Sequence, residues 1–442
     1  MVVGAEKTKM DYVKEERKEQ QLEEPPGMEE PPGTCDEPPH PWQKVPLREW
    51  SDWRWQMRHA LRTVEQLDRI IELTPDEREA ISTLGHLRVQ VTPYLASLIK
   101  RGDSSCPIRR QVIPTTAECR VCAGTMEDSL AEEEQSPVPG LVHRYPDRVL
   151  LLATTLCASY CRYCTRSRLV GNGARAGVRD WQPAIDYIAR HPEVRDVLVS
   201  GGDPLTLADS VLEKLLSGLR AIEHVEVIRI GSRVPCVLPQ RITPELVSVL
   251  GRYHPLWMNI HFNHPAEITP EVEAALARLA DAGIPLGSQS VLLAGINDCP
   301  NVIKALGQKL VRNRVRPYYL YQCDLVEGAG HFRTPVAKGI EIMEALRGHT
   351  SGFAIPQYVI DAPGGGGKIP ILPTYLISQS DSHVVVRNYE GMVSAYAQPE
   401  HYDGHDVSRC DYCNGRSGVA ALLDGGQAAI KPEGWSRSHV KH

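Results

Sequence analysis

The stretch Arg148-Val149-Leu150-Leu151-Leu152-Ala153 is a short apolar run, and the loop after it reads Cys157-Ala158-Ser159-Tyr160-Cys161-Arg162-Tyr163-Cys164. A short apolar run is typical of a buried strand in a parallel sheet. Three cysteines spaced C-x3-C-x2-C can bind three irons of a [4Fe–4S] cluster, because thiolates are soft ligands. Zinc sites more often use C-x2-C pairs and four ligands. The spacing therefore favours an iron–sulfur cluster with one iron left open.

Apolar runs and amphipathic stretches alternate on the C-terminal side of this loop. Such alternation is typical of βαβ units and a parallel sheet. We therefore predict the α/β class and a partial parallel (βα) barrel, in which functional residues lie at the carboxyl ends of the strands. The predicted strands are 148–153, 196–200, 225–230, 256–260, 285–292, 315–320 and 353–360, and the predicted helices are 181–190, 210–222, 244–253, 270–282, 301–311 and 336–346.

The chain outside the barrel has two kinds of composition. Residues 1–40 hold 11 acidic and 5 basic side chains, which account for the whole formal net charge of −6, and they are rich in proline. We expect residues 1–41 to be a disordered tail, because such a segment buries too little apolar surface to fold. Residues 42–145 are predicted to be a helical N-terminal region. The barrel would then occupy residues 146–370, followed by a C-terminal extension over 371–442.

Two patterns support helices in this N-terminal region. Apolar residues from Trp50 to Leu67 follow a helical period and predict one amphipathic helix. Thr74 and Glu77 have the spacing of a capping box, with Pro75 at the first helical position.

Composition also limits the compartment and the partners. The chain has no apolar run of about 18 residues, which a membrane span would need, and no apolar segment near Met1 typical of a secretory signal. We therefore expect a cytoplasmic protein with no membrane partner. Twelve cysteines in such a chain favour metal binding over disulfides. Beyond residue 40 the charges balance and no basic block occurs, so we expect no nucleic-acid partner.

Chemically reactive side chains follow several of the predicted strands. Gly201-Gly202-Asp203 comes after the second strand, Asp324 after the sixth and Asp361 after the seventh. Asp361 is followed by the glycine run 364–367 and by Lys368. Because the carboxyl ends of parallel strands meet at one edge of the sheet, we expect these residues to share a site.

The glycine run before Lys368 does not form a phosphate-binding loop of the G-x4-G-K-[ST] type. Ala362 stands where the first glycine is needed, and Ile369 where the hydroxyl residue is needed. A lysine on a backbone without bulky side chains suits a Schiff base with a carbonyl cofactor. A flexible loop with a solvated lysine is the alternative from the residues alone.

These motifs together resemble the lysine 2,3-aminomutase family of radical S-adenosylmethionine (SAM) enzymes. The likeness runs from Trp50 to near the C-terminus and includes residues 137–140, 143–148, 231–233, 261–265, 321–324 and 347–352. It implies a radical SAM barrel and three cofactors. A [4Fe–4S] cluster would be bound by Cys157, Cys161 and Cys164, SAM by the open iron with Gly201, Gly202 and Asp203, and pyridoxal 5′-phosphate (PLP) by Lys368.

The resemblance also implies the reaction, in which a radical removes hydrogen from C3 and the amino group moves from C2 to C3. Arg166 matches the family residue that binds the substrate carboxylate, and Arg144 and Arg148 match positions near PLP. Asp324 and Asp361 match the two carboxylates that bind the side-chain ammonium of lysine.

We therefore expect an isomerase that converts L-lysine to L-β-lysine. Conversion of L-arginine to β-arginine stays an alternative, because a guanidinium would also suit two carboxylates. A non-catalytic iron–sulfur protein is a less favoured alternative, since it leaves Lys368 and the two aspartates unexplained.

Partners are implied in the same way. The resemblance implies an amino acid substrate, an electron donor such as flavodoxin or ferredoxin, and a homo-oligomer, with 371–442 as a candidate oligomerisation region. Zinc is left open. Clostridial-type relatives bind it partly through three cysteines near the C-terminus, where this chain has Cys410 and Cys413. Cys119 and Cys122 form another C-x2-C pair.

Overall fold

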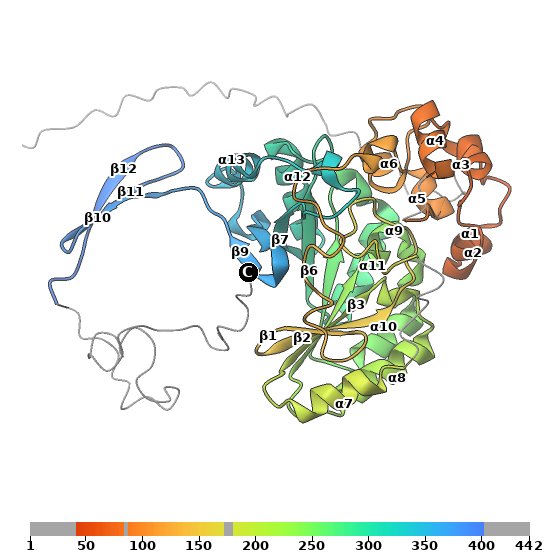
Figure 1. Cartoon of the computed structure of the whole chain (residues 1–442), viewed down its shortest axis with the longest axis horizontal. Helices are drawn as coiled ribbons and strands as arrows, with labels where there is room; N and C mark the ends of the chain where they lie inside the picture. The colour runs from red at the N-terminus through yellow and green to blue at the C-terminus, as the bar shows by residue number, and fades with distance from the viewer. Residues whose placement is uncertain (1–40, 84–86, 172–179, 402–442) are drawn as a thin grey trace, which may run out of the picture. The chain divides into compact units, whose positions relative to one another are not determined.

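The computed structural model describes residues 41–83, 87–171 and 180–401 (Figure 1). The chain divides into two compact units, one ending at Pro373 and the other beginning at Thr374. The predicted tail up to residue 40 and the pair Cys410 and Cys413 lie outside the described residues. Within the described ranges, no helix has both the length and the apolar character that a membrane crossing requires.

A nine-stranded sheet forms the centre of the first unit, and its strand order follows the chain (Figure 1). β2 to β8 are parallel, while β1 and β9 pair antiparallel at the two edges. The predicted α/β class and partial parallel barrel are thus confirmed. The strands are β1 (Leu141–Tyr145), β2 (Arg148–Thr154), β3 (Asp196–Gly201), β4 (Val227–Ser232), β5 (Leu256–His261), β6 (Leu286–Leu292), β7 (Val315–Gln322), β8 (Gln357–Ala362) and β9 (Gly367–Pro370).

Helices connect the parallel strands, as crossover connections require. In α8, four leucines at helical spacing, Leu212, Leu215, Leu216 and Leu219, are fully buried. Burying one such side chain contributes about 1.5–3 kcal/mol, so this face holds the helix on the sheet. The helices are α7 (Gln182–Arg190), α8 (Asp209–Arg220), α9 (Val234–Val237), α10 (Pro244–Gly251), α11 (Pro270–Asp281), α12 (Pro300–Arg312) and α13 (Val336–Leu346).

The predicted barrel elements all overlap observed ones, with small shifts at their ends. The strand predicted over 353–360 begins later, at Gln357, because the short 3-10 helix η7 (Gly352–Ala354) occupies the preceding residues. The side chain of Ser351 caps this turn by accepting a hydrogen bond from the N–H of Phe353 at 3.3 Å.

The two edges of the sheet meet at Lys368. On β9, Lys368 lies opposite Asp361 of β8. Its backbone N–H donates a hydrogen bond of 3.1 Å to the hydroxyl of Tyr145, on β1. The glycine run before it forms the 3-10 turn η8 (Pro363–Gly365) and then enters β9. Lys368 is thus held on a paired strand, which differs from the flexible loop considered as an alternative.

The N-terminal region is helical, but one prediction there was wrong. In place of one helix from Trp50 to Leu67, the chain forms α1 (Leu47–Trp50), α2 (Trp53–Arg58) and α3 (Val64–Ile71). The side chains of Asp52 and Thr63 accept hydrogen bonds from the N–H groups two or three residues later and so start new helices. Local capping overrides the longer apolar period.

The predicted capping box at Thr74 is confirmed. The N–H of Thr74 donates to Glu77 Oε2 at 2.7 Å, and the N–H of Glu77 donates to Thr74 Oγ1 at 3.2 Å. It opens α4 (Pro75–Thr83), which is followed by α5 (Pro93–Ser97) and α6 (Pro107–Val112). The end of the predicted helical region instead forms β1, which carries Arg144 and Tyr145.

The described part of the second unit is a three-stranded antiparallel sheet. It consists of β10 (Leu376–Gln379), β11 (His383–Arg387) and β12 (Val393–Ala397), in that order.

Candidate active site

A cavity of about 610 Å³ lies inside the barrel. Its wall includes residues from β1 to β9 and from the loops after β2, β3 and β4. Every site residue predicted from the sequence lines it. These residues are Arg144, Arg148, Cys157, Cys161, Cys164, Arg166, Gly201, Gly202, Asp203, Asp324, Asp361 and Lys368.

Residues of the N-terminal region form hydrogen bonds and an ion pair with the cysteine loop after β2. Gln90 Nε2 donates to the carbonyl oxygens of Cys157 and Ala158, at 2.9 and 3.2 Å. Arg162, within the loop, forms a buried ion pair with Glu118 and donates to the carbonyl of Leu87. The loop conformation therefore depends on these polar contacts as well as on the loop's own sequence.

The cysteine side chains face a low-dielectric environment. Burial raises the pKa of the Cys164 thiol to about 11 and that of Cys157 well above its usual value. Both are therefore protonated in the metal-free protein, and iron binding must displace the protons.

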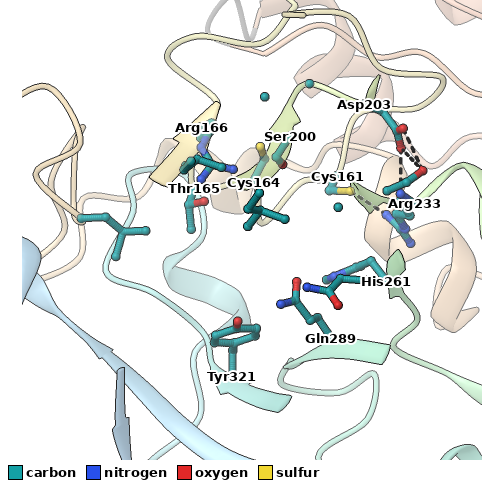
Figure 2. Close-up of a pocket in the computed structure, with 18 of the residues that line it drawn as sticks. Cys161, Cys164, Thr165, Arg166, Ser200, Asp203, Arg233, His261, Gln289 and Tyr321 are labelled. Carbon is teal, nitrogen blue, oxygen red and sulfur yellow. Dashed lines mark hydrogen bonds between the residues drawn. The ribbon is translucent and has the colours of Figure 1, made fainter. Parts of the chain in front are cut away.

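Arg233, just after β4, touches this loop directly (Figure 2). Its Nη1 donates to Cys161 Sγ at 2.7 Å, while its Nη2 donates to Glu267 Oε1 at 2.9 Å and to Gln111 Oε1 at 2.7 Å. Because Glu267 and Gln111 are both buried, they hold the guanidinium in place. This arrangement places a fixed cation beside the Cys161 sulfur.

The loop after β3 approaches the cysteine loop very closely. A Cβ on Gly202 would lie 2.3 Å from the carbonyl oxygen of Leu156, and one on Gly201, at a φ of +118°, would lie 2.4 Å from that of Thr154. Only glycine fits at these two positions. The glycine pair thereby brings backbone atoms of β3 to the cavity next to the cysteines.

Asp203, the third residue of this motif, is directed into the protein (Figure 2). Its carboxylate accepts hydrogen bonds from the Ser232 hydroxyl at 2.8 Å and from the N–H groups of Arg233 at 2.7 Å and Val234 at 3.0 Å. Burial outweighs these bonds and raises its pKa. Its side chain joins the loops after β3 and β4, although the residue also reaches the cavity wall.

Lys368 lies on another part of the wall, among three charged residues. Its Nζ donates to Asp361 Oδ2 at 2.9 Å, and Arg144 Nη1 donates to Asp361 Oδ1 at 3.3 Å. Asp324 lines the same cavity, and in the described part of the chain nothing donates a hydrogen bond to its carboxylate. Burial, and then the charge of Asp361, raise the pKa of Asp324 to about 7.

Two other predicted arginines have partners of their own. Arg166 binds Glu132 through Nε, at 3.0 Å to both carboxylate oxygens, and through Nη2, at 2.6 Å to Oε1. Arg148 pairs with Asp147 at 3.0 Å, and its guanidinium carbon lies 4.0 Å from the centre of the Tyr145 ring. Arg166 thus has a buried anionic partner, whereas Arg148 is partly exposed.

Sequence reasoning missed several polar residues of the cavity. His261 and Tyr321 belong to the motifs that carry the resemblance, and Gln289 lies on a predicted strand, so all three positions had a signal in the sequence. For Glu132 the sequence offered no signal other than its place in the acidic run 132–134. Burial, with the nearby Arg233 cation, lowers the pKa of His261 to about 3 and keeps its ring neutral. Figure 2 shows His261, Gln289 and Tyr321 across the cavity from Arg166 and Cys164.

Comparison with known proteins gives the family. The model of the radical SAM superfamily matches residues 151–305, and the model described as lysine-2,3-aminomutase matches residues 343–442. The L-lysine 2,3-aminomutase of Acetoanaerobium sticklandii is 55% identical over 405 residues, which cover 90% of this chain and 97% of that protein. The chain belongs to the lysine 2,3-aminomutase family.

Two further relatives in this family differ in their named substrate. The L-lysine 2,3-aminomutase of Clostridium subterminale is 54% identical over 402 residues, covering 89% of this chain and 96% of that protein. The glutamate 2,3-aminomutase of Clostridioides difficile is 45% identical over 347 residues, covering 78% of this chain and 82% of that protein. The predicted family and the enzyme class, an isomerase of the radical SAM superfamily, are confirmed.

Membership of the lysine 2,3-aminomutase family implies a [4Fe–4S] cluster and SAM, and the cysteine loop fits them. All three cysteines line one cavity, with a cation beside Cys161 and close backbone at Gly201 and Gly202. Across residues 41–83, 87–171 and 180–401, no three His, Cys, Asp or Glu side chains are grouped to hold a single metal ion. A cubane differs from such a site, because each thiolate binds a different iron.

The candidate zinc ligands are two pairs of cysteines. Cys119 is exposed and Cys122 partly buried, and neither is disulfide-bonded. Cys410 and Cys413, the other candidate ligands, lie outside the described residues.

Proposed function

We propose that this chain catalyses the 2,3-aminomutation of L-lysine to L-β-lysine, with a [4Fe–4S] cluster, SAM and PLP as cofactors. The observation that carries the proposal is the placement of two reactive sets on one cavity. Cys157, Cys161 and Cys164 lie on one part of the wall, and Lys368 with Asp361 lies on another. Chemistry that needs both a radical source and a carbonyl cofactor requires such a shared space.

The cofactors would supply the difficult chemistry: the cluster with SAM would provide a radical that abstracts a hydrogen atom from the substrate, and PLP would stabilise the substrate while its nitrogen migrates. The protein residues would bind these cofactors and the substrate and orient them. Cys157, Cys161 and Cys164 would ligate the cluster, and the backbone at Gly201 and Gly202 would approach SAM.

Lys368 would hold PLP. Its backbone is fixed by β9 pairing and by the Tyr145 hydroxyl, so its side-chain nitrogen has a defined position. Asp361 Oδ2 accepts a hydrogen bond of 2.9 Å from this nitrogen and so orients it. Arg144 and Arg148, both on the cavity wall, supply positive charge for a phosphate.

The substrate would be held at both ends. Arg166 suits the α-carboxylate, because a guanidinium is always charged and binds carboxylates bidentately. Asp324 and Asp361 suit a cationic side chain. They disfavour glutamate, whose side chain would meet two carboxylates.

Arginine is the second candidate substrate. The support for it is the same pair, since Asp324 and Asp361 could also bind a guanidinium. The named L-lysine 2,3-aminomutases at 54–55% identity favour lysine over arginine.

The remaining partners follow from this chemistry. A flavodoxin or ferredoxin would supply the reducing electron, and a homo-oligomer would form with residues 371–442 as the oligomerisation region. The oligomeric state in solution and the rate of electron transfer from a purified donor can each be measured directly.

The cofactor arrangement can be tested on protein purified and reconstituted without oxygen. Borohydride reduction should attach the pyridoxyl group to Lys368, and mass spectrometry of the peptides should locate it there. Lys338, a partly exposed lysine paired with Glu341, is the control and should stay unmodified. Trapping at another lysine, or no trapping in protein that holds its cluster, would overturn the PLP assignment.

A further inference from the structure

Glu132 is a buried carboxylate on the cavity wall to which the proposed reaction gives no role. Its side chain is 5% exposed and that of its partner Arg166 is 20% exposed. The two groups share three short contacts, of 3.0, 3.0 and 2.6 Å. A buried, multiply hydrogen-bonded pair of this kind fixes the orientation of a guanidinium.

Glu132 occupies one edge of the Arg166 guanidinium, the edge formed by Nε and Nη2. Glu132 uses Nε and Nη2, and among the residues that the structure describes, none accepts a hydrogen bond from Nη1 of Arg166. Arginine has five N–H donors in a rigid plane, so a second carboxylate can bind at the Nη1 side while Glu132 stays in place. Because Arg166 lines the cavity, that second carboxylate would come from a ligand.

Glu132 is itself held by a second arginine, Arg168. Arg168 Nη2 lies 3.6 Å from Glu132 Oε2 and 3.0 Å from Asp128 Oδ2, and Arg168 Nε lies 3.3 Å from Glu133 Oε1. Arg166 and Arg168 lie two and four residues after Cys164, so ion pairs join the acidic segment 128–133 to the chain just beyond the cysteine loop. A second cation therefore lies within ion-pair distance of Glu132.

Charge supports the same arrangement. Without Glu132, the Arg166 cation would add to Lys368 and Arg144 around a cavity proposed to take a cationic side chain. Burial opposes ionisation of Glu132, but the charge and hydrogen bonds of Arg166 outweigh it and lower its pKa. Glu132 is therefore an anion at neutral pH and offsets Arg166.

We propose that Glu132 is a positioning residue that holds the Arg166 guanidinium with its Nη1 edge toward the cavity, where it selects the α-carboxylate of the substrate. This inference rests on the proposed function, because it takes Arg166 as the carboxylate-binding residue. It adds that substrate does not displace Glu132 but binds beside it.

The test is an equilibrium titration of L-lysine into PLP-loaded enzyme without SAM, followed by the change in pyridoxal absorbance. Glu132→Gln keeps the shape and removes the charge, and should raise the Kd by about tenfold or more, the size expected for a charged hydrogen bond. Glu132→Asp should recover part of the loss. The matched control is Glu133→Gln, whose parent side chain is 64% exposed and contacts Arg168, and it should bind lysine within about twofold of the parent.

A double-mutant cycle separates positioning from a general structural effect. In an Arg166→Ala background, Glu132→Gln should change the Kd by less than about twofold, because Glu132 then has no guanidinium to orient. Equal losses in both backgrounds, or an unchanged Kd in the parent background, would overturn the inference. If the parent enzyme itself shows no lysine-dependent change, the proposed function fails and the inference fails with it.

Discussion

The side-chain nitrogen of Lys368 lies 2.9 Å from Oδ2 of Asp361, because β8 and β9 place the two residues opposite each other. The residue proposed to hold PLP and a residue proposed to bind the substrate cation are therefore an ion pair in the cofactor-free protein. Bonding of Lys368 to a carbonyl would weaken this pair and leave Asp361 available to the substrate. If both proposed roles hold, cofactor binding and substrate recognition would be coupled through the Asp361 carboxylate.

Asp361→Asn should weaken substrate binding more than cofactor binding. Loss of a charged hydrogen bond is worth about 1.5–3 kcal/mol, so the KM for L-lysine should rise at least about tenfold. PLP content, measured by absorbance, should stay near that of the parent. Asp281→Asn, at an exposed ion pair with Arg314, is the control. An unchanged KM would show that Asp361 does not contact the substrate.

The pH dependence of substrate binding should report Asp324. With a pKa of about 7, Asp324 is neutral at pH 6 and ionised at pH 8, so the KM for a cationic substrate should fall as pH rises across this range. Asp324→Asn should remove that part of the profile. A profile that is the same in the variant and the parent would assign the titration to another group.

Asp324 should also affect stability in a pH-dependent way. Its pKa is raised in the folded protein, so its stabilising contribution is present below pH 4 and is lost as pH rises through 7. Asp324→Asn should therefore raise the melting temperature relative to the parent more at pH 8 than at pH 5. The opposite trend in thermal unfolding would contradict the raised pKa.

The ion pair between Arg162 and Glu118 should be needed for a stable cysteine loop. Arg162→Met removes the cationic partner of a buried carboxylate, which costs about 3–5 kcal/mol. Urea unfolding should show this loss, and iron content after reconstitution should fall. Arg195→Met breaks an exposed pair with Glu226 and should cost less than about 1 kcal/mol. Similar losses in the two variants would show that burial does not distinguish the pairs.

Replacing Cys157, Cys161 or Cys164 by Ala should each prevent assembly of the cluster. Iron analysis should show the loss, and reductive cleavage of SAM should stop, because three protein ligands leave none to spare. Cys299→Ala, at an exposed cysteine, should behave as the parent. A variant of the three that keeps its iron and cleaves SAM would contradict the ligand assignment.

The barrel and much of its cavity were predictable from sequence because both depend on local patterns. Strand β6 (Leu286–Leu292) was predicted to within one residue, since Gly283 and Ala294-Gly295 bound the segment on either side. The three cysteines, Asp203 and Asp324 follow the ends of β2, β3 and β7, and the parallel topology brings those ends together.

Contacts between residues far apart in the chain were not predictable in this way. Tyr145 and Lys368 join the two edges of the sheet across 223 residues, and Glu132 reaches Arg166 across 34. No helical or strand periodicity in the sequence indicates either contact. The three short N-terminal helices were missed for a local reason, because the caps at Asp52 and Thr63 interrupt an apolar period that by itself indicates one helix.

Identification of the reaction product would show whether this chain is a 2,3-aminomutase that acts on lysine. Reconstituted enzyme with SAM and a reductant, kept free of oxygen, would be incubated separately with L-lysine, L-arginine, L-glutamate and L-alanine. Formation of β-lysine from lysine should be the fastest conversion, and no β-glutamate should form. Faster formation of β-arginine would make arginine the substrate, and no β-amino acid from any of the four, in protein that holds its cluster and PLP, would contradict the account.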